Sequence, residues 1–320
     1  MTEDQALAKM IPPNQKRIMA TGRMKQQGGV IQIWITRACD LACFNCTQAS
    51  NLGGNPGKIT LDQFEQACIS LKDYFGVVGI FGGNPCVHPQ FEEMCTILRK
   101  YIPKSRCGLW SNNPMGKGKI CRETFNPGAS NLNVHLSQKA YDEFKRDWPE
   151  CKPIGLKEDS RHSPVHLAMK DVIADESERW DKISNCDINK YWSAMIGVFR
   201  GELRGWFCEI AGAQSMFQQD KPNYPDTGIP IPTPGDKQWW EYGMNYYKHQ
   251  VKKHCHECAV PLRGYGELAC STNGVEQTSK TYADLYKPKR KGREVQIVTT
   301  LEELQHQVTR TTDYLQNSRI

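Results

Sequence analysis

Three cysteines within eight residues, Cys39, Cys43 and Cys46, constrain this chain more than any other feature of its sequence. The Cys-x3-Cys-x2-Cys spacing brings three thiolates onto one short loop, where they are able to ligate three irons of a [4Fe-4S] cluster and leave the fourth iron without a protein ligand. A structural zinc site wants four ligands and commonly pairs two Cys-x2-Cys units, which this loop does not supply. The loop therefore favours an iron–sulfur cluster, with zinc or buried free thiols as the alternatives.

Composition bounds the environment of these cysteines. The chain has 320 residues, 39% of them hydrophobic, so it is long enough to bury a core. We find no export signal and no apolar run near the roughly 20 residues that cross a bilayer, which predicts a cytoplasmic protein without a membrane contact. Fourteen cysteines in a reducing compartment indicate metal binding rather than disulfides. The net charge of +6 permits an anionic substrate without demanding nucleic acid.

Strand and helix patterns alternate from residue 31 to about Cys186. Residues 31–36 alternate as a strand that leads into the cysteine loop, and Thr60 to Gln63 form a capping box that opens a helix. Further strands are expected at 77–81, 107–111, 132–136 and 165–169. This order predicts an α/β fold with a parallel sheet covered by helices, in an open or closed barrel, whose ligands gather at the C-terminal strand ends.

From about Cys186 onward the sequence no longer shows this regular alternation. We expect a mixed, partly helical stretch at 184–200, a helix at 207–217, a proline-rich loop at 220–235 and a terminal helix near 300–316. The basic run at 287–293 is interpreted as a solvated loop, with a phosphate contact as the alternative. The resulting division is an N-terminal extension (1–30), a barrel (31–200), a cysteine-containing module (201–285) and a basic loop with a C-terminal helix (286–320).

The cysteine loop resembles the signature of the radical S-adenosylmethionine (SAM) superfamily, Cys-x3-Cys-x-aromatic-Cys after the first strand. Cys39-Asp-Leu-Ala-Cys43-Phe-Asn-Cys46 matches its three cysteines, while Asn45 stands at the usual aromatic position and Phe44 lies one residue earlier. The resemblance implies a partial (β/α)6 barrel, a SAM-binding [4Fe-4S] cluster and an adenine contact from Asn45.

A second match follows the next expected strand. Gly82-Gly83-Asn84-Pro85 is similar to the family's Gly-Gly-Glu-Pro, which contacts the amino group of SAM. Because Asn replaces Glu, the resemblance implies a contact through backbone carbonyls. Glycines also let the main chain approach a ligand closely.

Weaker matches stand at later strand ends. The resemblance implies that Ser111, Asn112 and Ser137 contact the ribose or carboxylate of SAM. Ordinary turn or N-cap chemistry is the equal alternative for these residues.

A second set of cysteines lies in the C-terminal third: Cys208, Cys255, Cys258 and Cys270. Four thiolates suffice for a fully ligated [4Fe-4S] cluster or for zinc. The segment resembles the auxiliary-cluster extensions, of SPASM or twitch type, that follow many radical SAM barrels, which favours iron and sulfur. Cys68 and Cys95 are expected in the core, Cys86 is a weak candidate for the active site, and the others, Cys107, Cys121, Cys151 and Cys186, are expected to be free thiols.

The resemblance implies that SAM chelates the open iron and that one electron, from a donor such as flavodoxin or ferredoxin, cleaves it to a 5′-deoxyadenosyl radical. That radical would abstract hydrogen from a sugar, a nucleoside or a related polar metabolite, for oxidation or rearrangement. The alternatives are the same chemistry on a nucleic acid or a peptide, and a non-catalytic iron–sulfur or zinc protein. No catalytic residue is assigned, since structural roles are expected for His135, Arg200, Arg204 and Glu209.

Overall fold

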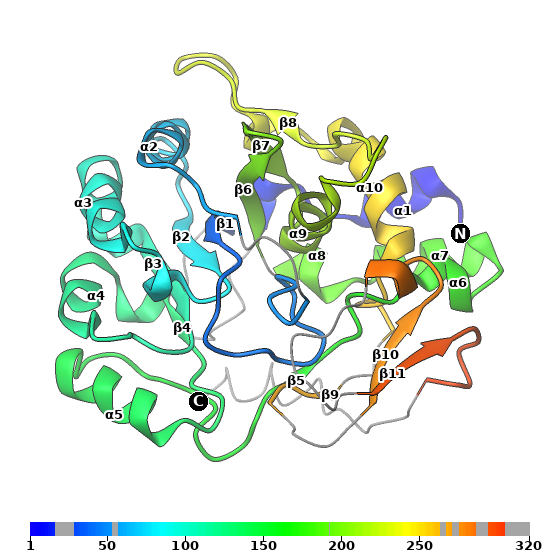
Figure 1. Cartoon of the computed structure of the whole chain (residues 1–320). Helices are drawn as coiled ribbons and strands as arrows, with labels where there is room; N and C mark the ends of the chain where they lie inside the picture. Colours follow the sequence, from blue (N-terminus) through cyan, green and yellow to red (C-terminus); the bar gives the residue numbers. More distant parts are fainter. Residues whose placement is uncertain are drawn as a thin grey trace.

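The computed structural model describes residues 1–16, 29–52, 57–191, 193–262, 267–270, 275–285 and 294–304. Within these ranges the centre of the molecule is a seven-stranded sheet in the order β4-β3-β2-β1-β6-β7-β8 (Figure 1). Its strands from β4 to β6 are parallel, whereas β7 and β8 are added antiparallel. An α/β fold with a mostly parallel sheet is therefore confirmed. The strands are β1 (Val30–Thr36), β2 (Val77–Gly82), β3 (Cys107–Ser111), β4 (Asn131–Leu132), β6 (Ala194–Phe199), β7 (Glu202–Trp206) and β8 (Ile229–Pro230).

Strand β1 lies in the middle of this sheet and is buried at every residue. A central parallel strand is covered on both faces, which explains why β1 is almost continuously apolar. The strands expected at 31–36, 77–81 and 107–111 are confirmed as β1, β2 and β3.

Four helices follow β1 to β4 in turn and cover the outer side of these strands (Figure 1). The first of them begins at the expected capping box, in which Thr60 accepts from the Gln63 amide and Gln63 accepts from the Thr60 amide. Each strand–helix unit therefore returns the chain to the same edge of the sheet. The helices are α2 (Leu61–Ser70), α3 (Phe91–Tyr101), α4 (Gly118–Thr124) and α5 (Gln138–Asp147).

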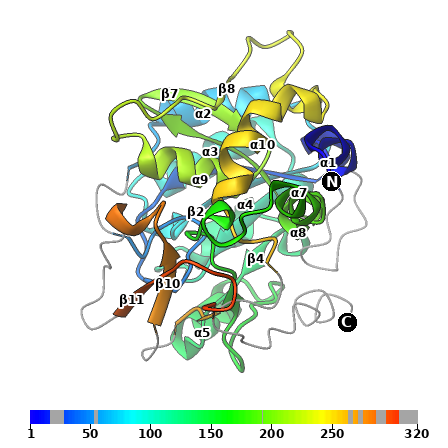
Figure 2. The same cartoon turned by 90° about the vertical axis from the view of Figure 1, so that its right-hand side faces the viewer.

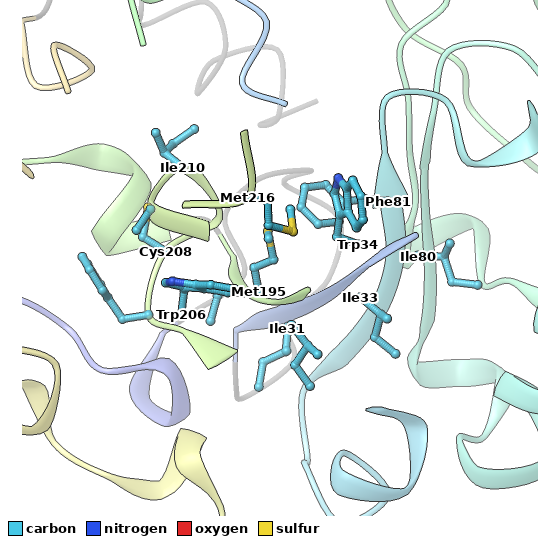
Figure 3. Packing of buried hydrophobic residues seen from close by; sticks show 14 of the residues in the cluster. Ile31, Ile33, Trp34, Ile80, Phe81, Met195, Trp206, Cys208, Ile210 and Met216 are labelled. Atoms are coloured by element: carbon cyan, nitrogen blue, oxygen red, sulfur yellow. The ribbon is translucent and has the colours of Figure 1, made fainter. Parts of the chain in front are cut away.

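The other face of the sheet carries α9 (Glu209–Gln218), which packs against β6 and β7 and confirms the helix expected at 207–217. Met195 and Met216 lie between Trp206 on one side and Trp34 and Phe81 on the other (Figure 3). Beyond α9 lies α10 (Lys248–His254), and α1 (Glu3–Lys9) lies beside α7 (Glu176–Ser184) (Figure 2). The short helices α6 (Met169–Val172) and α8 (Asp187–Tyr191) flank α7 in the chain.

Two small sheets lie apart from the main one. Strand β5 (Arg161–His162) pairs antiparallel with β9 (Glu267–Leu268), and β10 (Val275–Ser279) pairs parallel with β11 (Glu294–Val298). The short 3-10 turns are Pro13–Gln15, Pro85–Val87, Lys104–Arg106, Pro127–Ala129, Trp239–Glu241, Met244–Tyr247, Cys255–Glu257 and Ala283–Leu285.

The strand order differs from that of a sequentially wound (β/α)6 arc, in which each strand pairs with the next along the chain and the sixth lies far from the first. Here β6 pairs with β1, with Ile31 opposite Ala194. The reason is that the chain between β4 and β6 contributes only β5, within the described residues, and β5 belongs to another sheet. The expected domain boundary between residues 200 and 201 falls in the hairpin between β6 and β7, which are paired strands of one sheet.

Three expected elements differ in the structure. The strand expected at 132–136 ends at Leu132, because His135 and Leu136 have φ angles of 45° and 66°, which a strand does not accommodate. Residues 165–168 form a turn that leads into α6 rather than a strand. Residues 300–304 are not helical.

Two expectations lie outside the described residues: the basic run at 287–293 and residues 305–316 of the expected terminal helix. Among the helices that the structure describes, none combines the length and the apolar character needed to span a bilayer.

Candidate functional site

The three signature cysteines lie on the loop that leaves β1 at the C-terminal edge of the parallel strands. Cys43 is buried, whereas Cys39 and Cys46 are half-buried. A hydrogen bond to Cys270 and burial raise the pKa of Cys43 above its usual value. The thiols of Cys46 and Cys39 lie near enough to raise this pKa further. A loop that gathers three thiols in this way fits a cluster with three protein ligands.

The middle of this loop is held by the small β5–β9 sheet, toward which it runs in Figure 1. The Phe44 amide donates to the Ala269 carbonyl at 2.7 Å, and His162 Nδ1 donates to the Phe44 carbonyl at 2.9 Å. The Phe44 side chain is fully buried. The ring of Phe44, the aromatic residue of the cysteine loop, therefore packs in the protein interior.

Asn45 adopts a left-handed conformation with φ of 48°. Its backbone amide donates to Glu276 Oε1 at 3.0 Å, and its Nδ2 donates to the His162 carbonyl at 3.4 Å. Its buried Oδ1 has no hydrogen-bond partner among the described residues. An unsatisfied buried acceptor is costly, so this oxygen can accept a hydrogen bond from a donor that is not among the described residues.

The glycines of the second motif approach the chain's own backbone. A Cβ on Gly82 would lie 2.0 Å from the Thr36 carbonyl oxygen, and one on Gly83 would lie 2.3 Å from that of Ala38. The Gly83 amide donates to Thr36 and the Asn84 amide to Ala38, both at 2.8 Å. These glycines are therefore required where β2 packs against the start of the cysteine loop, whereas their contact with SAM stays a prediction. Pro85 opens the buried turn that follows.

Asp40, inside the cysteine loop, accepts hydrogen bonds from three asparagine side chains. Asn84 and Asn112 donate to its Oδ1 at 2.9 and 3.0 Å, and Asn113 donates to its Oδ2 at 3.1 Å. Burial alone raises the pKa of Asp40, but these amides outweigh it and lower the pKa below its usual value. Ser111 Oγ donates to Asn84 Oδ1 at 2.9 Å. The strand-end residues therefore lie beside the cysteine loop as expected, and their side chains tie that loop to β2 and β3.

Ser137 is a helix N-cap, which was the alternative to a contact with SAM. Its Oγ accepts from the Ala140 amide at 3.2 Å, which makes it the N-cap of α5. Within the described part of the chain, no hydrogen bond joins its side chain to the cysteine loop.

Cys270 lies at this first group of cysteines, not at the second. Its Sγ is 3.6 Å from Cys43 Sγ, and its amide donates to Asp159 Oδ2 at 2.6 Å. His135 Nδ1 is 3.1 Å from Asp159 Oδ1, and ligand atoms of Cys43, His135 and Cys270 all lie within 4.8 Å of one another. Burial opposes the charge on His135, but hydrogen bonds to Asp159 and Cys270 raise its pKa to about 9. A hydrogen bond from Cys43 and the nearby His135 lower the pKa of Cys270 to about 5, although burial alone would raise it.

Four other cysteines line a single cavity: Cys186, Cys208, Cys255 and Cys258. Burial raises the pKa of each of these thiols. Cys186 lies between α7 and α8, Cys208 precedes α9, and the other two follow α10, so the fold rather than local spacing brings them together. Cys186 takes the place that the sequence had given to Cys270. Four thiols around one cavity, those of Cys208 and Cys258 on buried residues and those of Cys186 and Cys255 on half-buried ones, fit a fully thiolate-ligated metal centre.

The remaining candidates have structural contacts. Arg200 is in the β6–β7 turn, where it donates to the Gln219 carbonyl, and Arg204 pairs with Asp226 at 2.8 Å. Glu209 follows Cys208, is buried, and accepts a hydrogen bond from the Ser193 hydroxyl. Burial raises the pKa of Glu209 to about 7.

No family model and no curated protein matches this sequence. Among solved structures, the chain is similar to BtrN in complex with AdoMet and 2-DOIA, with 13% identity, a TM-score of 0.43 and coverage of 73% of this chain and 89% of that one. It is also similar to BtrN in an open conformation, with 12% identity, a TM-score of 0.38 and coverage of 78% and 94%.

Proposed function

We propose that this protein is a radical SAM enzyme. The observation that carries the proposal is the convergence of Cys39, Cys43 and Cys46 on one loop at the C-terminal edge of the parallel strands, where α/β folds bind their ligands. When bound there, a [4Fe-4S] cluster with one open iron would supply the electron that cleaves SAM to a 5′-deoxyadenosyl radical. The expected substrate is a sugar, a nucleoside or a related polar metabolite.

The chain's own contribution at this site is to fix and enclose the loop. Asp40 and its asparagine partners hold the loop against the ends of β2 and β3. Asn45 Oδ1 has no hydrogen-bond donor among the described residues, so it is available to accept a hydrogen bond from the adenine amino group. Radical chemistry depends on orientation and on excluding other hydrogen donors, so a rigid loop suits it.

The four-cysteine cavity is proposed to hold a second [4Fe-4S] cluster, with Cys186, Cys208, Cys255 and Cys258 as its ligands. Full thiolate ligation leaves no iron open to a substrate, so electron transfer or structural support is the proposed role.

The electron donor, the polar substrate and the cytoplasmic location stay predictions of the sequence. So does the alternative of a nucleic-acid or peptide substrate, for which the basic run at 287–293 lies outside the described residues.

A second candidate function has a specific observation in its favour. Two thiolates on one tetrahedral zinc ion, with bonds of about 2.3 Å, lie about 3.8 Å apart. The 3.6 Å separation of Cys43 and Cys270 and the nearby His135 approach that arrangement. A non-catalytic zinc protein would use this trio and leave Cys39 and Cys46 without metal.

Metal analysis after anaerobic reconstitution separates the two functions. The radical SAM proposal expects about eight irons per chain in two clusters. Replacing Cys39 or Cys46 with alanine should then remove about half of the iron. The zinc alternative expects bound zinc that these two replacements leave in place and that Cys270→Ala removes.

A further inference from the structure

Lys16 is a fully buried lysine at the end of the N-terminal segment, only 1% exposed. Its Nζ donates a 2.7 Å hydrogen bond to the carbonyl of Phe207, the residue before Cys208, and lies 5.9 Å from the centre of the Phe207 ring. A buried ammonium is costly unless negative charge compensates it, and a neutral carbonyl does so only in part. The position of this lysine therefore needs an explanation.

The N-terminal segment reaches the four-cysteine cavity through Met10. Met10 and Asn189 both line the cavity. Asn189 fixes the segment through two hydrogen bonds, because its Oδ1 accepts from the Ile11 amide at 3.0 Å and its Nδ2 donates to the Ile11 carbonyl at 3.2 Å. Lys16 thus enters the protein on a segment that is anchored at the cavity.

The groups that interact electrostatically with Lys16 are three of the four cavity cysteines, Cys208, Cys186 and Cys255, together with Glu209. Burial lowers the pKa of Lys16, and these four groups oppose that effect. As neutral thiols the cysteines offer the ammonium little compensation. As metal-bound thiolates they would provide negative charge beside the buried ammonium.

We propose that Lys16 belongs to the second metal centre as a positioning residue, whose buried positive charge raises the reduction potential of the iron–sulfur cluster held by the four cysteines. The inference rests on the proposed function, since it requires a cluster at that centre. One-electron reduction adds a negative charge to the cluster, and a cation held nearby at low dielectric stabilises the reduced state more than the oxidised one. The electron comes from the external reductant and stays on the cluster.

The test is a redox titration followed by electron paramagnetic resonance, in a Cys39→Ala background that lacks the first cluster. Lys16→Met removes the charge and keeps an apolar chain, Lys16→Arg keeps the charge, and Lys9→Met removes an exposed lysine from the same segment. We expect Lys16→Met to disfavour reduction at least tenfold, which is about 59 mV for one electron, while the other two variants stay near the parent.

The results separate the two proposals. An unchanged potential in Lys16→Met, with the cluster intact, overturns the role of Lys16 and leaves the proposed function standing. Zinc in place of iron at the second centre of the parent protein overturns both the cluster assignment and the role of Lys16. If Lys16→Met binds no cluster, the Lys16→Gln variant is titrated in its place, and retention of the parent potential there overturns the inference.

Discussion

The Sγ atoms of Cys43 and Cys270 lie 3.6 Å apart, although 227 residues separate these cysteines in the sequence. The contact brings the C-terminal third of the chain onto the loop that carries the signature cysteines, where the Ala269 carbonyl also accepts from the Phe44 amide. It also removes Cys270 from the group of cysteines that the sequence had assigned to a second centre.

The first prediction concerns this exchange of cysteines. Cys186→Ala should lose about four of about eight irons, because Cys186 lines the four-cysteine cavity, whereas Cys270→Ala should keep them. Iron content and the electron paramagnetic resonance signal of the second cluster measure the difference. Loss of the second cluster from Cys270→Ala, with Cys186→Ala unaffected, would restore the assignment from the sequence.

Sequence patterns were sufficient for the elements whose signals are local. The capping box at Thr60 and the buried strands β1, β2 and β3 depend on residues within a few positions of one another, and the structure confirms them. The strand expected at 132–136 was wrong beyond Leu132. There Asn133 Oδ1 accepts from the His135 amide and forms a local turn that hydrophobic alternation does not reveal.

The two groups of cysteines could be predicted only in part, because only one of them is defined by local spacing. Cys39, Cys43 and Cys46 share one loop, so their spacing identifies them. Cys186 has no neighbouring cysteine in the sequence. It reaches the cavity only because the fold brings residues of α7, α8 and α9 to the same lining. Tertiary contacts of this length leave no mark in a single sequence.

The second prediction concerns the glycine motif. Gly83→Ala should destabilise the metal-free protein by about 3 kcal/mol, because the new Cβ would meet the Ala38 and Arg37 carbonyl oxygens at 2.3 and 2.6 Å. Gly243→Ala is the matched control, since nothing lies within 4 Å of a Cβ built there. Urea unfolding of the two variants gives the comparison, and equal stabilities would contradict the packing account of this motif.

The third prediction concerns Asp40. Asp40→Asn replaces one acceptor oxygen with a donor, so at least one of the three asparagine donors loses its partner, at a cost of about 1–3 kcal/mol. The exposed Asp73→Asn should leave the unfolding free energy within about 0.5 kcal/mol of the parent. If both variants unfold at the same urea concentration as the parent, Asp40 does not hold the loop.

The fourth prediction concerns the His135–Asp159 pair in the metal-free protein. The folded-state pKa of His135 is raised to about 9, above the ordinary value of 6.5, so its contribution to stability is full below about pH 6.5 and is lost as the pH rises through 9. The difference in unfolding free energy between the parent and His135→Gln should shrink over that interval. Asp159→Asn should reduce the same pH dependence but leave part of it, because the hydrogen bond to Cys270 also raises the pKa of His135. A constant difference from pH 6 to 10 would refute the pairing.

The central claim is that Cys39, Cys43 and Cys46 support reductive cleavage of SAM. The direct measurement is the formation of 5′-deoxyadenosine from SAM under dithionite, by anaerobically reconstituted parent protein and by Cys39→Ala, with Cys255→Ala as the comparison at the second centre. We predict product from the parent, none above background from Cys39→Ala, and some uncoupled product from Cys255→Ala. An iron-loaded parent that forms no 5′-deoxyadenosine, or a Cys39→Ala variant that forms as much as the parent, would contradict the claim.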